Sequence, residues 1–387
     1  MKEGWRYEKL DDLGTIVTGA TPSTNDESNY FPKEYCFVKP SDLPLNGVGS
    51  IHETENYVSS KGLSVSRPLP AGSVLTTCIG TIGKVGLLLQ EGCTNQQINA
   101  VIPNNKINSR YLAYALLSIR KQLEFIANAP VVPIINKKSF SKIHIGYPPK
   151  PTQLSIVSEL DKLNELIWIK KEQLKDYDTL AQSIFYEMFG DPVENEKGWE
   201  VKKFGEIGTL ERGAGISKKD FVDDGLPCIH YGQLHTIFGA YTRKNITFIP
   251  KDLLPKYKIA HSGDLILAIT SEDVEGSCKS TAWLGNFDVV VGSDAAIFHH
   301  NQNGIYLSYY TRTKAFYNEK AKYAKGFKVT HISTKEIASI SICIPPISIQ
   351  NTFANKIEQI EKQKAIIQKI IMDLETLLAS RMQYWFD

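Results

Sequence analysis

The chain has 387 residues, with 44 Lys and Arg against 42 Asp and Glu, so its formal net charge is only +2. A hydrophobic share of 42% is ordinary for a globular protein, and at about 100–200 residues per domain the length predicts two or three domains. With no run of about 18 apolar residues and no apolar core near the N-terminus, neither a membrane span nor a signal peptide is expected. The six cysteines lack metal-ligand spacing, which argues against a zinc site and indicates a reducing cytoplasm. A charge this small does not point to a nucleic-acid partner.

Internal repeats indicate that the chain is a tandem duplication. Residues 4–23 (GWRYEKLDDLGTIVTGATPS) and 198–217 (GWEVKKFGEIGTLERGAGIS) are identical at eight of twenty positions. Further matches follow in the same order: YLAY (111–114) with YLSY (306–309), and IHIGYPPKPTQ (143–153) with ISICIPPISIQ (340–350). Ordered matches at three places predict one unit of about 195 residues that is used twice.

The first part of each unit is rich in short β-type runs. These are YCFVKP (35–40), SVLTTCIG (73–80), KVGLLL (84–89) and INAVIP (98–103), then LPCIHYG (226–232), DLILAIT (264–270) and DVVVGSDAAIFHH (288–300). Runs of this length, separated by Gly and Asn turns, predict β-rich mixed domains. Helical spacing appears locally at 109–126.

After each proline pair, apolar residues recur at heptad spacing. They are Ile156, Leu160, Leu163, Ile167, Leu174 and Ile184 in the first stretch, and Phe353, Ile357, Ile360, Ile367, Ile371, Leu374 and Leu378 in the second. Each stretch predicts a helix of roughly 38 residues, or about 57 Å. One such helix alone could form a homodimer seam, but two in one chain favour antiparallel pairing with each other. The polar Lys170 and Lys364 would then help to fix the register.

Together these patterns predict an α+β protein with an internal pseudo-twofold duplication. Two β-rich mixed globular domains, at 1–150 and 192–346, are expected to be separated by two long antiparallel coiled-coil helices. The central spacer helix should occupy 151–191 and the distal one 347–387.

The small net charge hides two strongly basic stretches at equivalent places in the units. Residues 106–150 hold eight Lys and Arg against Glu124 alone, and residues 312–335 hold seven against Glu319 alone, with aromatic residues interleaved. A solvated helix face would explain one such stretch, but a matched pair favours two polyanion-binding surfaces. Two such surfaces held apart by a rigid spacer suit duplex DNA.

The sequence offers no pattern for bond-making or bond-breaking chemistry. It lacks a Gly-rich cofactor loop after a strand and an Asn-Pro-Pro-aromatic tetrad, and residues 80–86 do not fit the phosphate-loop pattern. Asp294, His299 and His300 have no counterpart in the first unit, so no metal site is expected. The sequence therefore predicts a binding protein.

Several motifs resemble the specificity subunit of type I restriction–modification systems. They are the GW-x4-L/F-x2-[LI]-G opening, the strand start at 263–267, the stretch at 228–232, and the PP-x3-Q junction that leads into each heptad helix. The resemblance covers the whole chain and implies a non-catalytic subunit whose two target-recognition domains each read half of a split DNA sequence, with the helices as the spacer. It implies double-stranded DNA, two modification (methyltransferase) subunits and restriction/translocase subunits as partners, in a bacterial or archaeal cytoplasm. S-adenosylmethionine, ATP and Mg are expected on the partner subunits, and no cofactor on this chain.

Because residues 24–105 and 218–300 resemble each other poorly, we expect an asymmetric bipartite target. Candidates for base reading are polar side chains beside strand ends: Lys39, Ser41, Thr77, Thr81 and Lys84 in the first domain, and His230, Tyr231, Gln233, Ser271, Lys279 and His331 in the second. For any one of them, ordinary loop solvation is an equal alternative. Phosphate contacts are expected at Lys137, Lys138, Lys325 and Lys328.

Two alternatives stay open at this point. One is a specificity module of a fused or modification-only methyltransferase system. The other is a non-catalytic coiled-coil adaptor that binds DNA and in which the heptads recruit another protein.

Overall fold

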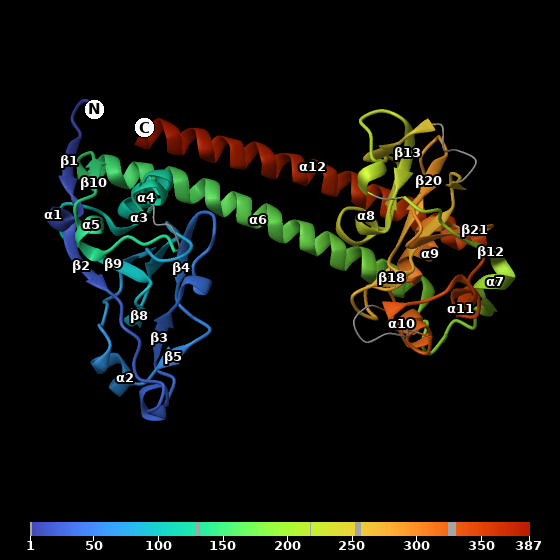
Figure 1. Cartoon of the computed structure of the whole chain (residues 1–387), viewed down its shortest axis with the longest axis horizontal. Helices are drawn as coiled ribbons and strands as arrows, with labels where there is room; N and C mark the ends of the chain where they lie inside the picture. Colours follow the sequence, from blue (N-terminus) through green and yellow to red (C-terminus); the bar gives the residue numbers. More distant parts are fainter. Residues whose placement is uncertain (1, 128–131, 217, 252–256, 324–329) are drawn as a thin grey trace. The chain divides into compact units, whose positions relative to one another are not determined.

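The computed structural model describes residues 2–127, 132–216, 218–251, 257–323 and 330–387, with only the backbone of residue 218 (Figure 1). The chain divides into two compact units, residues 1–172 with 369–387, and residues 173–368. Each unit contains one globular domain and a portion of each of the two long helices.

The first domain begins with a strand and ends with the strand that precedes the first long helix. Its elements are β1 (Arg6–Lys9), α1 (Leu10–Leu13), β2 (Gly14–Thr18), η1 (Glu27–Asn29), β3 (Tyr35–Val38), η2 (Pro40–Asp42), β4 (Val48–Ile51), β5 (Tyr57–Val58), α2 (Ser60–Val65), β6 (Val74–Thr77), β7 (Val85–Leu88), β8 (Gly92–Thr94), β9 (Ile98–Pro103), α3 (Ser109–Ser118), α4 (Arg120–Ile126), α5 (Lys137–Ser141) and β10 (His144–Tyr147). Helix α6 (Lys150–Phe189) follows.

The second domain repeats this order with local additions. Its elements are β11 (Glu200–Lys203), α7 (Phe204–Ile207), β12 (Gly208–Arg212), η3 (Lys218–Asp220), β13 (Leu226–Ile229), α8 (Tyr231–Thr236), β14 (Tyr241–Thr242), β15 (Thr247–Ile249), β16 (Lys258–Ala260), β17 (Leu265–Ala268), β18 (Thr270–Ser271), β19 (Ser280–Trp283), β20 (Val289–Val291), β21 (Ala295–His300), α9 (Gly304–Tyr310), α10 (Lys314–Ala321), β22 (Thr330–His331), α11 (Thr334–Ala338) and β23 (Ser341–Ile344). Helix α12 (Ile347–Phe386) completes the chain.

The duplication is visible in the sheet topology of the two domains. The largest sheet has the order β2-β9-β6-β7-β4 in the first domain and β12-β21-β17-β19-β14 in the second. In both, the last strand of that order is parallel to its neighbour and the other pairs are antiparallel. The smaller sheets, β5-β3-β8 and β15-β13-β20-β16, also correspond, and β16 is an addition in the second domain. These sheets and their helices confirm the α+β class.

Several sequence runs form shorter elements than we expected. The run INAVIP is strand β9 over its whole length, but the run at 226–232 is divided into β13 and α8. The run at 288–300 forms two strands, β20 and β21. The helical segment at 109–126 is divided into α3 and α4 at Ile119, whose φ of −90° and ψ of 15° leave the α-helical region. Periodicity located these segments, and local backbone geometry set where they end.

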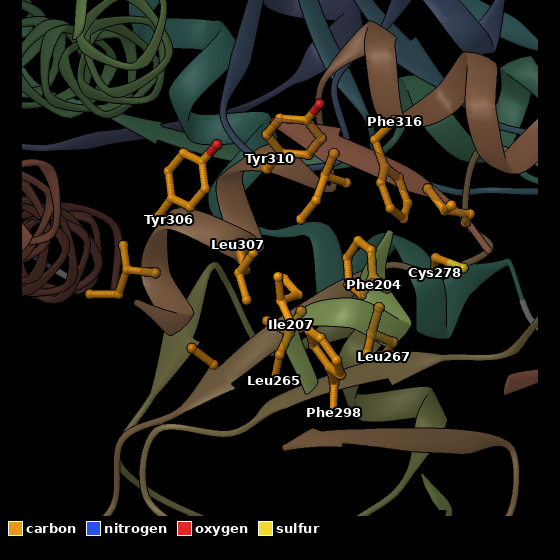
Figure 2. Packing of buried hydrophobic residues seen from close by; sticks show 14 of the residues in the cluster. Phe204, Ile207, Leu265, Leu267, Cys278, Phe298, Tyr306, Leu307, Tyr310 and Phe316 are labelled. Atoms are coloured by element: carbon orange, nitrogen blue, oxygen red, sulfur yellow. The ribbon is translucent and has the colours of Figure 1, made fainter. Parts of the chain in front are cut away.

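The core of the second domain lies between the largest sheet and the helices beside it. Phe204 and Phe298 pack with ring centroids 4.8 Å apart, and Phe316 and Tyr310 belong to the same cluster (Figure 2). The C-terminal end of α6 contributes the buried Phe185 and Phe189 to the same cluster. These aromatic residues anchor the helix end in the domain, because large buried rings contribute most to a core.

A buried glutamine ties each long helix to its domain. Gln153 is fully buried, accepts the backbone N–H of Asn108 at 2.8 Å and donates to the carbonyl of Pro148 at 2.9 Å. Gln350 repeats this arrangement with Asn303 at 2.9 Å and Pro345 at 2.8 Å. The PP-x3-Q junction is therefore a structural motif: the glutamine satisfies backbone groups that burial would otherwise leave unpaired.

Both long helices run for 40 residues, and each unit contains an antiparallel pairing of their segments. In the first unit, Glu159 pairs with Arg381 and Lys171 with Glu375. In the second unit, Lys364 pairs with Asp178 at 2.7 Å across the helices, which supports the expected role of Lys364 in fixing the register.

The expected heptad residues are buried to different degrees. Ile156, Leu160, Phe353 and Ile357 are fully buried, and Leu163, Ile167, Ile360, Ile367 and Ile371 are nearly so. Four others are half-buried: Leu174, Ile184, Leu374 and Leu378. Heptad spacing alone did not identify Phe185 and Phe189, because the helix end packs against its domain as well as against the other helix.

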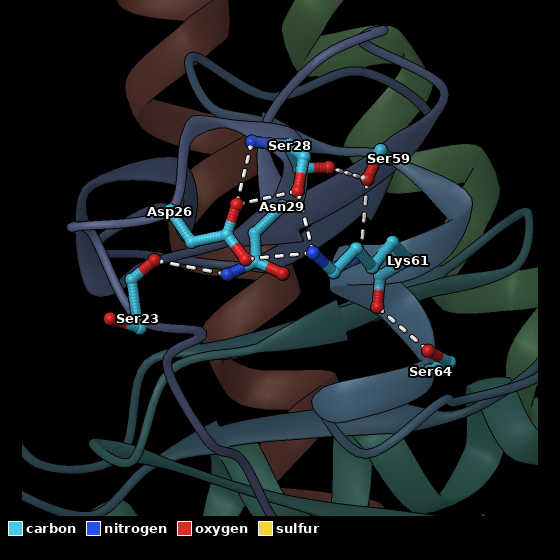
Figure 3. A network of polar contacts seen from close by, with 8 residues as sticks. Ser23, Asp26, Ser28, Asn29, Ser59, Lys61 and Ser64 are labelled. Atoms are coloured by element: carbon cyan, nitrogen blue, oxygen red, sulfur yellow. Dashed lines mark hydrogen bonds and ion pairs between the residues drawn. The ribbon is translucent and has the colours of Figure 1, made fainter.

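A network of polar contacts in the first domain surrounds η1 and the start of α2 (Figure 3). Asp26 forms an ion pair with Lys61 at 2.8 Å, and the hydrogen bond from Lys61 is the main reason that the pKa of Asp26 falls to about 2. Ser59 donates to the Ser28 carbonyl at 2.6 Å, and Asn29 donates to the Ser23 carbonyl at 3.0 Å. The contacts of Lys61 and Ser59 join η1 to the start of α2, and the contact of Asn29 joins η1 to the preceding loop.

All six cysteines are buried and free. Across the residues that the structure describes, no helix is both long enough and apolar enough to span a bilayer.

Candidate nucleic-acid interface

In the first domain, three base-reading candidates lie around one short helix and one turn. Lys39 precedes η2, and its backbone N–H donates to the Asp42 carboxylate at 2.7 Å, which caps the helix. From the turn between β6 and β7, Nζ of Lys84 donates to the carbonyl of Pro40 at 2.8 Å. Lys39, Lys84 and the exposed Ser41 are therefore brought together at one edge of the domain.

Thr77 stabilises the same turn through hydrogen bonds of its buried hydroxyl group. It is fully buried, its hydroxyl donates to the Thr81 carbonyl at 2.5 Å, and it accepts the backbone N–H of Lys84 at 3.0 Å. Its hydroxyl is therefore used within the fold, whereas the side chain of Thr81 is exposed at the tip of the turn.

The phosphate candidates of the first domain follow a segment that pairs with this turn. The N–H of Gly80 donates to the Pro133 carbonyl at 3.0 Å, and the N–H of Ile135 donates to the Cys78 carbonyl at 2.8 Å. Helix α5 starts directly afterwards and carries Lys137 and Lys138 in exposed positions. The other two phosphate candidates, Lys325 and Lys328, lie outside the described residues.

In the second domain, the surface that corresponds to the edge around η2 lies around α8. Gln233 is almost fully buried: its side chain accepts the N–H of His230 at 3.1 Å and donates to the Thr247 hydroxyl at 3.2 Å. Nζ of Lys279 donates to the His235 carbonyl at 2.8 Å. Gln233 thus caps α8 and faces the protein, while Tyr231 at the start of the helix is exposed.

The remaining candidates of the second domain lie near a cavity of about 1190 Å³. Tyr231, Ser271 and Lys279 line it, and His331 lies on β22, which pairs with β18 at the cavity wall. His331 is exposed, and its Nδ1 is 3.3 Å from the Thr270 hydroxyl. The structure therefore gathers Tyr231, Ser271 and Lys279 at one concave surface.

The cavity also contains charged residues that were not among the sequence candidates. The cations are Arg312, Lys314 and Lys320, and the carboxylates are Glu272, Asp273 and Glu275. Lys320 is nearly buried and donates to the carbonyls of Glu275 at 2.7 Å and Ser277 at 2.5 Å, and burial lowers its pKa. A comparison of loop lengths between the repeats points to this region: seven residues separate β6 from β7, at 78–84, whereas residues 269–279 separate β17 from β19.

The histidines of the second domain form contacts at another edge of the sheet. His299 Nδ1 is 2.8 Å from the buried carboxylate of Asp264, and His261 Nδ1 is 2.8 Å from Asp288. Burial lowers the pKa of His300 to about 4, so this ring is neutral at physiological pH. Within the described ranges, no group of three or more His, Cys, Asp or Glu side chains is arranged to hold a metal ion.

Two domains of one topology, each with a lysine-braced turn beside a short capped helix, define a duplicated recognition protein. Both halves match the type I restriction modification DNA specificity domain, over residues 2–176 and 196–376. The chain therefore belongs to this family and carries two copies of its domain. It is a specificity subunit with two target-recognition domains, and subunits of this class work with methylase and restriction subunits.

Curated relatives and solved structures are consistent with this assignment. The chain is 23% identical to the type I restriction enzyme MjaIX specificity subunit of Methanocaldococcus jannaschii, over 96% of this chain and 90% of the relative. It is 24% identical to the MjaVIII specificity subunit of the same organism, over 77% of this chain and 74% of the relative. Among solved structures, the S subunit from M. genitalium has a TM-score of 0.57 at 12% identity, covering 99% of this chain and 96% of that one. A chain from a study of complex assembly in the type I system has a TM-score of 0.60 at 18% identity, covering 100% and 98%.

Proposed function

We propose that this specificity subunit reads an asymmetric bipartite DNA target, one half-site with each domain. The observation that carries the proposal is the pair of equivalent edges: Lys84 beside η2 and Lys279 beside α8 occupy the same topological place. Around these anchors the exposed side chains differ, because the first edge has Ser41 and Thr81 where the second has Tyr231 and an acidic loop. Different side chains meet different base edges, so the half-sites should differ.

This proposal assigns a role to each segment of the chain. Residues 1–150 and 192–346 are the two target-recognition domains, and residues 151–191 and 347–387 are the spacer helices. The paired helix segments found in each unit support a spacer role, since ion pairs such as Lys364–Asp178 fix the register.

Contacts with DNA divide into those that hold phosphates and those that read bases. Lys137 and Lys138 are exposed at the start of α5, and we assign them, with Lys325 and Lys328, to phosphates. Of the base-reading candidates, Ser41, Thr81, Tyr231 and His331 are exposed, and Lys39 and Ser271 are half-buried. Thr77 and Gln233 are buried and hydrogen-bonded within the fold. We assign them to support of the reading edge, by which we mean the surface around Lys84 in the first domain and around Lys279 in the second.

The helices offer a surface for the modification subunits. In the first unit, α6 exposes Leu166, Trp168 and Ile169, and α12 exposes Met372 and Leu377. Trp168 and Met372 are more than 60% exposed, so their apolar surface is open to a partner. We propose that a modification subunit covers these residues, that a second one docks likewise on the complex, and that restriction/translocase subunits join through them.

The chemistry is assigned to those partners, with S-adenosylmethionine, ATP and Mg²⁺ bound there. This chain supplies recognition without catalysis, and because its substrate is cellular DNA we place it in the cytoplasm. The competing possibility, a fused or modification-only methyltransferase, predicts that the isolated chain binds S-adenosylmethionine. Titration calorimetry with this cofactor should show no binding to the isolated chain, and saturable binding would favour the competitor.

The central experiment is methylation mapping with the modification subunit present. The proposal expects methylated adenines in two different half-sequences separated by a constant gap. Identical inverted half-sites would contradict the asymmetric assignment. A coiled-coil adaptor with incidental basic patches would instead direct no sequence-specific methylation at all.

A further inference from the structure

The acidic loop in the second domain has no counterpart in the first. Residues 269–279 (ITSEDVEGSCK) connect β17 to β19, and residues 78–84 (CIGTIGK) connect the equivalent β6 to β7. The shorter connection contains no carboxylate, whereas the longer one carries Glu272, Asp273 and Glu275. We call residues 271–277 of the second domain the acidic arm. The two domains therefore differ in charge at the place where their reading edges correspond.

Hydrogen bonds and a buried neighbouring residue hold the acidic arm in place. The nearly buried Lys320 donates to the carbonyls of Glu275 and Ser277, and the Asp273 carboxylate accepts the N–H of Gly276 at 2.6 Å, closing the turn. Cys278 is fully buried in the core cluster to which Phe316 belongs (Figure 2). Lys279 joins the end of the arm to α8 through the His235 carbonyl. A fixed loop of this kind presents its side chains in defined positions, as specific recognition requires.

Two carboxylates on this arm remain available to a ligand. Glu272 and Glu275 are exposed and line the cavity, and neither accepts a hydrogen bond nor forms an ion pair with any residue that the structure describes. Asp273 differs, because its carboxylate accepts a hydrogen bond from the backbone N–H of Gly276 within the turn. The same cavity holds the exposed Lys314, a cation suited to a phosphate, whereas Lys279 and Arg312 donate to backbone carbonyls of the fold.

A carboxylate on a DNA-binding surface repels phosphates, so it favours binding only where the DNA presents a hydrogen-bond donor. An ionised carboxylate accepts hydrogen bonds and cannot donate them. In the major groove, guanine presents N7 and O6 acceptors, adenine sets an N7 acceptor beside its amino group, and thymine presents O4 and a methyl group. Cytosine presents its N4 amino donor without a neighbouring acceptor, so it is the base that a carboxylate matches.

We propose that Glu272 and Glu275 are specificity determinants of the second domain, and that they accept hydrogen bonds from cytosine amino groups in the major groove. The exposed Lys314 of the cavity holds a flanking phosphate. The assignment rests on the proposed DNA-reading function, and it states which bases the half-site of the second domain contains. The first domain has no equivalent carboxylates in its β6–β7 turn, so its half-site does not depend on this contact.

The test uses the full chain and a pool of duplexes with randomised half-sites, selected by binding and sequenced. Glu272→Gln, Glu275→Gln and the double variant are compared with Asp224→Asn, an exposed position of the same domain outside the cavity lining that loses the same charge. At one or more cytosines of a single half-site, the preference should fall roughly tenfold and shift towards adenine, because Gln pairs with adenine N6 and N7. Lys84→Met should weaken the other half-site, which identifies the one read by the first domain.

Asp224→Asn should raise affinity for all sequences alike and leave base preference unchanged. The assignment is overturned if the Glu272 and Glu275 variants behave like Asp224→Asn, or if both half-sites change equally. A wild-type chain that enriches no sequence would instead overturn the proposed function, so the two failures are distinguishable. Unchanged thermal melting of the Glu272, Glu275 and Asp224 variants establishes that their comparison is between folded proteins, and a cooperative melting transition establishes that Lys84→Met is folded.

Discussion

Lys84 and Lys279 make the same contact in the two domains of this chain. Each lysine directly precedes a strand of the largest sheet, β7 or β19, and each donates from Nζ to a backbone carbonyl at 2.8 Å. The acceptors belong to Pro40, in η2, and His235, in α8, which are the short helices that follow β3 and β13. The two proposed reading edges are therefore held by the same kind of hydrogen bond, although the side chains around these lysines differ.

Removal of either hydrogen bond should destabilise its own domain and impair its own half-site. Lys84→Met and Lys279→Met each lose a hydrogen bond from a charged donor, so we expect the free energy of unfolding to fall by about 1–2 kcal/mol. Denaturant unfolding measures this change, and methylation mapping shows which half-site has weakened. Lys84→Arg and Lys279→Arg, which keep a charged donor, should lose less. If the methionine variants lose base preference at full stability, these lysines read bases directly.

The exposed lysines at the start of α5 should act on all sequences equally. Lys137→Ala and Lys138→Ala remove exposed positive charges that form no ion pair with any residue that the structure describes, so stability should not change. If each lysine neutralises one phosphate, the slope of log affinity against log salt should decrease by about 0.9 per variant. Lys162→Ala, on an exposed position of α6, is the charge-matched control and should leave the slope unchanged. A change in base preference with an unchanged slope would assign these lysines to base reading.

Much of the fold could be predicted because its signals are periodic or repeated. The duplication located the glutamines of the PP-x3-Q junctions, and heptad spacing identified the residues that are most deeply buried, such as Ile156 and Phe353. Strand β9 follows its apolar run residue for residue. In each case the information is contained in consecutive residues, so one sequence is enough.

The reading edges were predicted less completely, because they depend on contacts between distant segments. Thr77 and Gln233 have polar side chains near strand ends, as a base-reading residue would, yet both are buried and hydrogen-bonded inside the fold. In the sequence, Lys320 is only one member of a basic stretch. Its hydrogen bonds to the carbonyls of Glu275 and Ser277 join residues 45 and 43 positions apart, and no local pattern predicts contacts at that distance. Only the folded arrangement separates a side chain that supports the edge from one that faces a ligand.

The end of α12 should be held in the first unit by a pH-sensitive contact. Arg381 and the indole of Trp385 both donate to the carboxylate of Glu159, and the hydrogen bond from Arg381 is the main cause of its lowered pKa. A lowered pKa means that the folded state stabilises the charged form. The contribution is therefore complete above the usual carboxyl pKa of about 4.5 and is lost as the pH falls through the lower value in the folded protein.

Glu159→Gln should remove this part of the acid sensitivity. In hydrogen exchange at neutral pH, amides near the C-terminus of α12 should exchange a few times faster in the variant than in the wild type. As the pH falls below about 4.5 and through the lowered pKa of Glu159, the wild type should approach the variant, because its carboxylate becomes protonated. Glu375→Gln is the matched control, since that carboxylate pairs with Lys171 on the same two helices at an exposed position. Equal protection of the α12 end in wild type and variant at pH 7 would show that the contact does not hold the helix.

Insertion of one heptad into each long helix should lengthen the gap between the half-sites. Suitable points are after Glu172 in α6 and after Gln368 in α12, where the two compact units meet along the sequence. Seven helical residues add about 10 Å, and at 3.4 Å per base pair this corresponds to roughly three base pairs. A full heptad in both helices keeps the buried positions in phase, so each unit retains its own helix contacts, such as Glu159–Arg381 and Asp178–Lys364.

Methylation mapping of the double insertion should therefore return both half-sequences unchanged, with a longer gap between them. An insertion in only one helix is the informative control, because it shifts that helix against its partner and should reduce binding to any gap. If the double insertion keeps the wild-type gap, the helices do not set the spacing. If the half-sequences themselves change, base reading depends on the helices as well as on the domain edges, contrary to the assignment of Glu272 and Glu275 to the second half-site.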